Sequence, residues 1–327
     1  KDIRWEKTTT VNVGVDFALF RHRLSGTIEY YNKYSVDLLA AINGSPTQGF
    51  GYTTLMTNNG KMVNRGVEIT LSGEIIRQKD FSWNASLLYA FNRNKVKHIS
   101  VQPSLWDSRI SMPTSYPMVG KPLYGIYAYK WAGLNENGDP QVYDAENNVT
   151  SGPARDYHAL VYCGTTVPIH NASLTNVLRY KGFEFSAMLI LDAGHKLRSS
   201  NIPSINMSNG RITSTAKGIV DRWTQPGDVT DVPRLLFSND TENFNTHRTE
   251  LYRYSDLFVY DASNIRLSNI SLAYRVPAHW CKKISLSGAR LQFNVENVAT
   301  FAFDSKANYD LGGKVKPNYV WGLYLNF

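Results

Sequence analysis

Apolar and polar residues alternate along many long segments of this chain. In the first such segment, valines and Phe17 occupy one parity, while Asn12, Gly14 and Asp16 occupy the other. Successive side chains of a β-strand point to opposite faces, so this period of two predicts strands with one apolar and one polar face. The pattern predicts about nine such strands, near residues 8–20, 23–37, 61–77, 81–98, 169–180, 182–195, 262–276, 286–297 and 318–327.

Strand length separates two all-β folds. The strands of a soluble β-sandwich also alternate, but they average about 5–6 residues. The runs predicted here are about twice as long, close to the ~9–11 residues that a tilted strand needs to cross a bilayer. Length therefore favours a transmembrane antiparallel β-barrel over a soluble, glycan-binding sandwich.

The connections between the predicted strands support the same choice. Links after odd-numbered strands are short, whereas the four after even-numbered strands, near 38–60, 99–168, 196–261 and 298–317, are long. Bacterial barrels have short periplasmic turns and long extracellular loops. The strand-like run 123–134 would break this parity, so we place it inside the second long loop.

Two local features are also predicted. A weak helix is predicted at 213–223, capped by Thr213 or Ser214, and a bulge is predicted near 267–270.

The barrel hypothesis makes a specific prediction about sidedness. Apolar residues of one parity should face lipid, namely Val13, Val15, Ile69, Leu71, Leu87, Phe185, Leu189, Phe293 and Leu323. Carboxylates of the other parity should face the lumen, namely Asp16, Glu68, Glu74, Glu184 and Glu296. Cys163 and Cys281 then fall in an extracellular loop and a periplasmic turn, too far apart to form a disulfide.

Composition narrows the function classes. The 327 residues carry a formal net charge of +8, but the basic residues are scattered. This pattern favours solvated loops and a polar lumen over nucleic-acid binding. No apolar run reaches the ~18 residues of a transmembrane helix. The chain begins at Lys1 without Met or an apolar signal region, so we expect that a longer protein was divided or processed.

Several motifs resemble those of one family, the SusC/RagA-type TonB-linked outer-membrane transporters. They lie in order along essentially the whole chain. The matching stretches are 5–17 (WEKTTTVNVGVDF), 26–33 (GTIEYYNK), 37–39 (DLL), 59–68 (NGKMVNRGVE), 81–86 (FSWNAS), 92–96 (NRNKV), 222–228 (RWTQPGD) and 261–270 (DASNIRLSNI).

The resemblance implies a fold and a set of partners. Residues 1–327 would be the C-terminal section of a larger, about 22-stranded barrel, and the N-terminal plug and first strands are absent from this chain. The whole protein would import glycans or oligopeptides across the bacterial outer membrane, which the barrel crosses many times. A SusD-like surface lipoprotein would cover it, and TonB–ExbB–ExbD would supply energy through the plug. An alternative is a SusC-like docking subunit of a larger outer-membrane complex that imports nothing.

Candidate site residues are few. No HExxH, GxSxG or P-loop occurs, so we expect no enzyme. Loop aromatics suit sugars or peptides, but loop packing or contact with a lid protein is the favoured explanation for any single one. The candidates are Trp106, Tyr116, Trp223, Tyr252 and Tyr254.

Two further features have simple alternatives. The run 135–139 (NENGD) is a candidate Ca²⁺ site, although such runs are ordinarily turns and no other cofactor or metal site is expected. The alternating end at Trp321, Leu323, Leu325 and Phe327 resembles the C-terminal signal read by the barrel assembly machinery. A randomly cut strand would seldom end on this parity, so we expect this C-terminus to be the native one.

Overall fold

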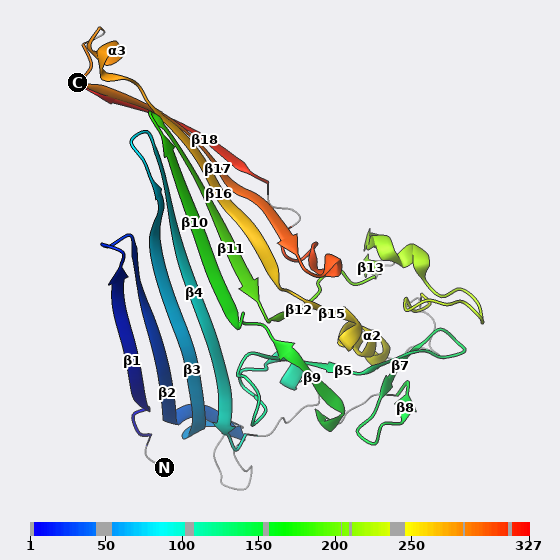
Figure 1. The fold of residues 1–327 in the computed structure, drawn as a ribbon. Coiled ribbons are helices and arrows are strands. Elements are labelled where there is room, and N and C mark those ends of the chain that lie inside the picture. The colour runs from blue at the N-terminus through cyan, green and yellow to red at the C-terminus, as the bar shows by residue number, and fades with distance from the viewer. Residues whose placement is uncertain are drawn as a thin grey trace.

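The computed structural model describes residues 3–43, 54–101, 108–152, 157–203, 205–208, 211–235, 246–283, 285–312 and 316–327. Its main feature is one nine-stranded antiparallel sheet, which we call the wall (Figure 1). Each wall strand after β1 pairs with the wall strand that precedes it along the chain. The strands are β1 (Lys7–Leu19), β2 (Leu24–Asn43), β3 (Thr54–Arg77), β4 (Phe81–His98), β10 (His170–Tyr180), β11 (Phe183–Ala193), β16 (Asn264–Arg275), β17 (Gly288–Ala302) and β18 (Asn318–Asn326). All the predicted spanning strands are confirmed, as is their order.

Three strand ends differ from the prediction. The β2–β3 ladder continues to the pair Asn43–Thr54, so much of the predicted loop 38–60 is paired strand. The register shifts near Leu38, next to Asp37 with its positive φ of 57°. Beyond this shift the side chains no longer keep the same alternation, so the continuing ladder could not be predicted from the period of two. Likewise β17 runs on to Ala302, past a register shift opposite β16.

The register confirms that the predicted apolar and acidic sets lie on opposite faces of the wall. Paired residues share a face, and one row joins Val15, Ile28, Ile69 and Tyr89 across four strands. Rows of the opposite face carry the acidic residues, such as the pair Glu29–Glu68. The predicted bulge is present as a register shift between Leu267 and Asn269. Because lipid cannot solvate charges, the polar face is the lumen side and the apolar face is the outer side.

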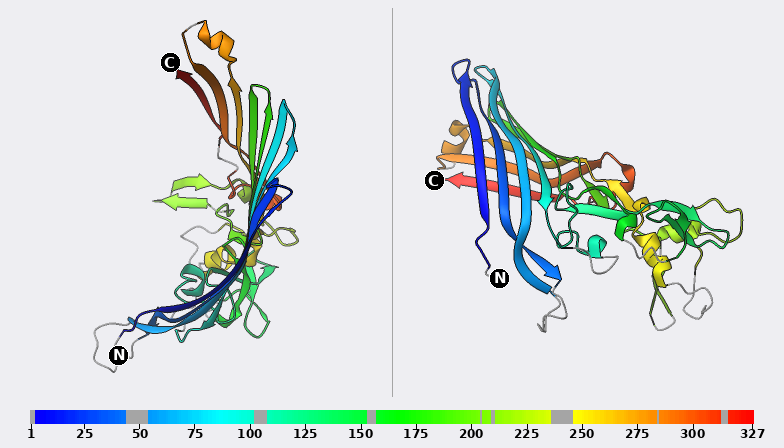
Figure 2. Two further views of the ribbon diagram at one scale, coloured as in Figure 1. Left: turned by 60° about the vertical axis from the view of Figure 1, so that its left-hand side comes forward. Right: turned by 90° about the horizontal axis from the view of Figure 1, so that it is seen from below.

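The wall has two different ends (Figures 1 and 2). At the turn end, the connections are short: residues 20–23, 78–80, 181–182 and the segment around α3 (Ala278–Lys282). Phe20, Arg21 and His22 all adopt positive φ, which reverses the chain tightly between β1 and β2. The long connections all leave from the other end, the loop end. This arrangement confirms the predicted alternation of short turns and long loops.

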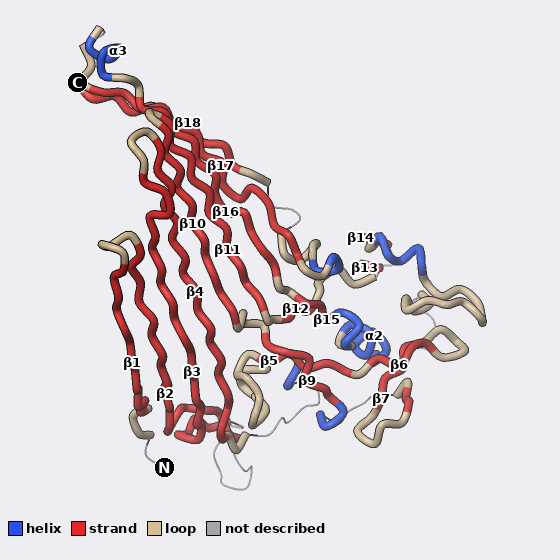
Figure 3. The backbone as a smooth tube through the Cα atoms, viewed as in Figure 1, coloured by secondary structure: helices blue, strands red, loops and turns tan. Residues whose placement is uncertain are grey.

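The long connections contain small elements of their own (Figure 3). Their strands are β5 (Gly125–Tyr129), β6 (Trp131–Leu134), β7 (Pro140–Tyr143), β8 (Val149–Thr150), β9 (Leu160–Thr165), β12 (Lys196–Arg198), β13 (Ile205–Ser208), β14 (Arg211–Thr215) and β15 (Val259–Asp261). Their helices are α1 (Ser108–Ser111) and α2 (Thr246–Arg253), with short 3₁₀ turns at Tyr157–Ala159, Lys217–Asp221, Asp256–Phe258 and Ser305–Ala307. As predicted, the run 123–134 lies outside the wall.

The predicted helix at 213–223 is wrong. Residues 211–215 form β14, which pairs with β13, and only Lys217–Asp221 forms a 3₁₀ turn. Its N-cap is Ala216, which has no side-chain oxygen to accept a capping hydrogen bond. Pairing with β13 therefore prevails over the weak local helical preference.

Within the described ranges, no helix has the length and apolar character needed to cross a membrane.

Candidate functional site: the polar wall face and the loop module

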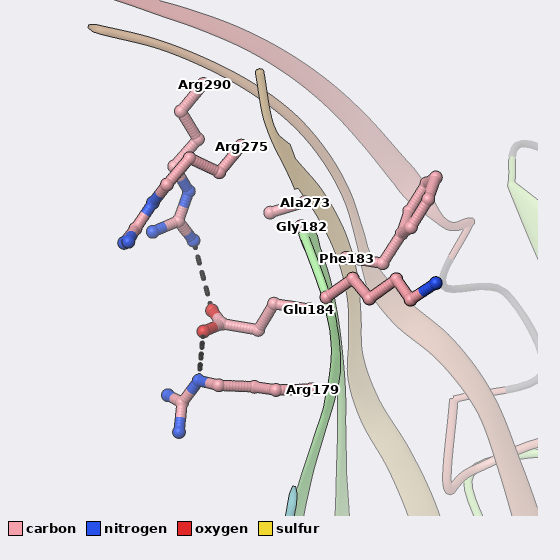
Figure 4. Close-up of a pocket in the computed structure, with 8 residues that line it drawn as sticks. Arg179, Gly182, Phe183, Glu184, Ala273, Arg275 and Arg290 are labelled. Carbon is pink, nitrogen blue, oxygen red and sulfur yellow. Dashed lines mark hydrogen bonds and ion pairs between the residues drawn. The ribbon is translucent and has the colours of Figure 1, made fainter. Parts of the chain in front are cut away.

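Ion pairs join strands on the polar face of the wall, some of them neighbours and some separated by one strand. Near the turn end, Glu184 Oε2 lies 2.7 Å from Arg179 Nε, and Glu184 Oε1 lies 3.1 Å from an Arg290 guanidinium nitrogen. These side chains project from one side of the sheet, while Phe183 projects from the other (Figure 4). They line a recess of about 190 Å³, together with Lys181, Gly182, Ala273 and Arg275. Basic groups outnumber the single carboxylate, so the recess is electropositive.

A second ion pair lies towards the loop end of the same face. Arg266 donates to Asp192 over 2.7 Å, and the Asn171 amide donates to the other oxygen of that carboxylate, also over 2.7 Å. Exposed ion pairs contribute about 0–1 kcal/mol each. Their main consequence is therefore positional: they fix a charged surface that suits a water-filled lumen.

Beyond the loop end, separate loops share one hydrophobic core. We call the described residues of 108–165 and 246–258 the loop module. Its fully buried members are Tyr127, Tyr129, Val142, Ala159, Leu160 and Leu251. Partly buried residues packed against them include Ile110, Met118, Trp131, Tyr157, Tyr162 and Tyr254. The second and third long loops are therefore joined into one packed body.

Partly buried charges stabilise this body. Asp139 accepts from Arg248 over 2.6 Å and from Arg234 over 3.2 Å, and the Arg248 guanidinium also donates to the carbonyls of Gly138 and Arg234. Arg198, in β12, donates to the carbonyl of Tyr127 over 2.7 Å. The Asp139 bonds to Arg248 and Arg234 connect segments about one hundred residues apart, and the Arg198 bond to Tyr127 spans 71 residues. Sequence reasoning missed all of these residues, because a single charge in a polar loop carries no periodic signal.

The structure places four of the five candidate aromatics. Tyr116 is half-buried and Trp223 packs on Gly138, where a Cβ atom would lie 2.4 Å from the indole. Tyr252 is buried between Trp131 and Phe258, at ring-centroid distances of 5.7 and 4.9 Å.

Tyr254 lies under the guanidinium groups of Arg198 and Arg253, and Trp106 lies outside the described residues. Tyr252 and Trp223 thus support the loop module, and ligand contact by the candidate aromatics stays a prediction.

The candidate calcium run is a turn. The Asn135 side-chain oxygen accepts from the backbone N–H groups of Asn137 and Asp139, and the Asp139 carboxylate is bonded to two arginines. Calcium binding stays a prediction, and it would require Asp139 to exchange both guanidinium partners for the ion. The described residues contain no group of three or more His, Cys, Asp or Glu that could hold a metal.

The last strand presents its predicted signal residues to the outer side. Trp321, Leu323 and Leu325 occupy one parity of β18, and the Trp321 ring lies 4.2 Å from that of Phe293. Phe327 follows directly and is 91% exposed. The geometry is that of an apolar strip available to another protein or to lipid, and its role as an assembly signal stays a prediction.

The two cysteines lie at opposite ends of the wall. Cys163 is in β9 of the loop module and Cys281 is in α3 at the turn end, and both are free thiols. Burial, and then the nearby Asp256 carboxylate, raises the pKa of the Cys163 thiol to about 11.

The pKa of Cys163 predicts its reactivity. Because the folded pKa lies above the unfolded pKa of about 8.5, the neutral thiol stabilises the folded state fully below that unfolded pKa. This contribution to the free energy of unfolding is lost as the pH rises through the folded pKa of about 11. In a Cys281→Ala variant, we expect maleimide to label Cys163 slowly at mildly alkaline pH and faster as the pH approaches the folded pKa. The same variant in denaturant is the control, and equal rates in the folded and unfolded forms would contradict the prediction.

Comparison with known proteins gives a consistent set of relatives. Residues 1–298 match the family described as "TonB dependent receptor-like, beta-barrel". TonB-dependent receptor P3 of Formosa agariphila is 25% identical over 98% of this chain and 33% of its own length. TonB-dependent receptor SusC of Bacteroides thetaiotaomicron is 25% identical over 91% of this chain and 29% of its own length.

A solved structure agrees with this fold. The RagAB peptide transporter superposes with a TM-score of 0.76 at 22% identity, covering 99% of this chain and 36% of that one. The chain thus spans about a third of the length of the proteins it matches. That family consists of transporters and receptors of the outer membrane and not of enzymes. From its wall, its sidedness and these matches, the chain belongs to the TonB-dependent receptor β-barrel family and forms part of a SusC/RagA-like barrel.

Proposed function

We propose that residues 1–327 form the C-terminal section of a barrel that imports glycans or oligopeptides across the outer membrane. The observation that carries this proposal is the charged polar face of the wall, with the pairs Glu184–Arg290 and Asp192–Arg266. Polar cargo moves through a hydrated lumen, and such a face is what a large barrel presents to it. The similarity of the fold to the RagAB peptide transporter supports peptides as one cargo class.

The loop module is the proposed docking surface for a SusD-like lipoprotein. It is an ordered body at the external end, and its core and its Asp139 bonds fix its shape without a partner. A preformed surface loses little entropy on binding, which suits repeated opening and closing of a lid. Tyr116 and Trp223 are the proposed cargo contacts in this region, whereas Tyr252 and Tyr254 pack within the loop module.

Energy would come from TonB–ExbB–ExbD through a plug domain carried by the rest of the protein. A second function, a docking subunit without import activity, shares the wall and the loop module. The two hypotheses differ in the plug: an importer needs a segment that TonB can pull, and a docking subunit does not.

The decisive test is growth of the native host after deletion of the whole gene. We expect growth to fail on either an oligosaccharide mixture or a peptide mixture as sole nutrient, and to return with the wild-type gene. A gene lacking the TonB-contacting segment should not restore growth. Unchanged growth on both mixtures, together with loss of a surface complex on native gels, would instead establish the docking role.

A further inference from the structure

The outer face of the wall changes character near its loop end. On β3, outward residues from Val67 to Ile75 are apolar or glycine, and on β4 those from Phe81 to Phe91 are apolar. At about 3.3 Å per residue and with a barrel's tilt, these runs match the ~25 Å apolar band of outer-membrane barrels. The next outward positions towards the loops are Arg65, Arg93 and Lys95. We call these three residues the basic cluster.

The basic cluster brings like charges together. Arg65 and Arg93 are directly opposite each other across β3 and β4, and Lys95 is opposite Val63 in the next row. All three basic residues are exposed, whereas Val63, opposite Lys95, is only 7% exposed. Like charges directly opposite in a sheet are destabilising unless a counter-charge is present.

The chain supplies no carboxylate for this counter-charge within its described part. The remaining outward residues of the two rows are Val11, Asn32, Thr9 and Tyr34. Arg65 donates to the amide oxygen of Asn32 over 3.0 Å. No ion pair among the described residues involves the basic cluster. Within the described part of the chain, the basic cluster therefore has no acidic partner.

The neighbouring rows identify this height as the membrane interface. One row towards the apolar band holds Tyr30 and His170, and the Tyr89 hydroxyl bonds His170 Nδ1 over 2.8 Å. Aromatic residues with a polar end form girdles where the apolar band of a barrel ends. The basic cluster thus lies just outside the hydrocarbon, at the depth of the lipid head groups of the external leaflet.

We propose that Arg65, Arg93 and Lys95 bind the phosphate groups of an anionic lipid in the external leaflet. Guanidinium groups present a planar fork of donors that matches phosphate oxygens, and two facing forks can share one phosphate or hold two adjacent ones. The proposal requires that the wall span the membrane with its loops outside, but it is independent of the cargo.

The test uses the full-length transporter, purified in detergent and titrated with diphosphorylated lipid A in native mass spectrometry. The variant R65Q/R93Q/K95Q removes the basic cluster, and the control R21Q/K79Q/K283Q removes the same charge at the turn end. Each cation near a phosphate contributes about fivefold in affinity. We expect the first variant to lose at least about tenfold in affinity and the control to keep wild-type affinity.

Three further arms make the result specific. The charge-retaining variant R65K/R93K/K95R should keep most of the binding, which separates loss of charge from loss of fold. Dephosphorylated lipid A should bind the wild type as weakly as diphosphorylated lipid A binds R65Q/R93Q/K95Q. Competition by inorganic phosphate at equal concentration should be small, because the lipid is also held by the apolar band. Two results would overturn the proposal. One is equal affinity of the wild type for diphosphorylated and dephosphorylated lipid A, and the other is an equal loss of lipid affinity in R65Q/R93Q/K95Q and R21Q/K79Q/K283Q.

Discussion

Residues 1–327, expressed alone behind an export signal, should not yield a folded barrel in the outer membrane. Among the described strands, the wall has two open edges, because β1 pairs only with β2 and β18 only with β17. Each unpaired backbone N–H or C=O costs several kcal/mol in lipid, so an open sheet cannot span the membrane. Direct closure is also unfavourable: after nine antiparallel strands, β1 and β18 run in the same direction and would form a parallel pair.

The measurement is heat-modifiable migration of the outer-membrane fraction on gels. The full-length protein is the positive control, and co-expression of the remaining N-terminal part with residues 1–327 should restore a folded barrel. A stable, heat-modifiable monomer of 1–327 without any partner would refute the claim that the edges need strands from elsewhere.

An arginine on the outer face at mid-membrane should destabilise the barrel far more than one on the polar face. Leu174 pairs with Leu87 and Leu189 in an apolar row, whereas its neighbour Thr175 pairs with Ser86 and faces the lumen. We expect Leu174→Arg to lower the free energy of unfolding by about 2–4 kcal/mol, because the guanidinium must enter hydrocarbon.

Thr175→Arg is the matched control, since it introduces the same group one residue away into water. We expect it to change the free energy of unfolding little. The measurement is urea unfolding of the full-length transporter in lipid vesicles. An equal decrease of the free energy of unfolding in both variants, or a larger decrease for Thr175→Arg, would contradict the assignment of the two faces.

The wall could be predicted because its physical cause repeats at every second residue. A strand between lipid and water must place apolar groups at one parity, as Val13 and Val15 do, and polar groups such as Asp16 at the other. The prediction was wrong where that regularity is interrupted. At Asp37 the positive φ shifts the register, so the continuing β2–β3 ladder shows no clean alternation.

The loop module could not be predicted for the opposite reason. Asp139, Arg234 and Arg248 meet only after the chain has crossed the wall several times, and nothing in their local sequence indicates a partner about one hundred residues away. Tyr252 was predicted as a ligand contact because it is an aromatic loop residue, yet its burial follows from Trp131 and Phe258 packing around it.

The sequence by itself determined the strands, their order, their sidedness and the family, because alternation and short motifs are local properties. Only the tertiary structure decided which charges meet across the polar face, how the long loops share a core, and that Arg65 faces Arg93 on the outer side. These features depend on the register between strands. A shift of one residue would turn every side chain of a strand to the other face, and pairing along the whole sheet fixes that register.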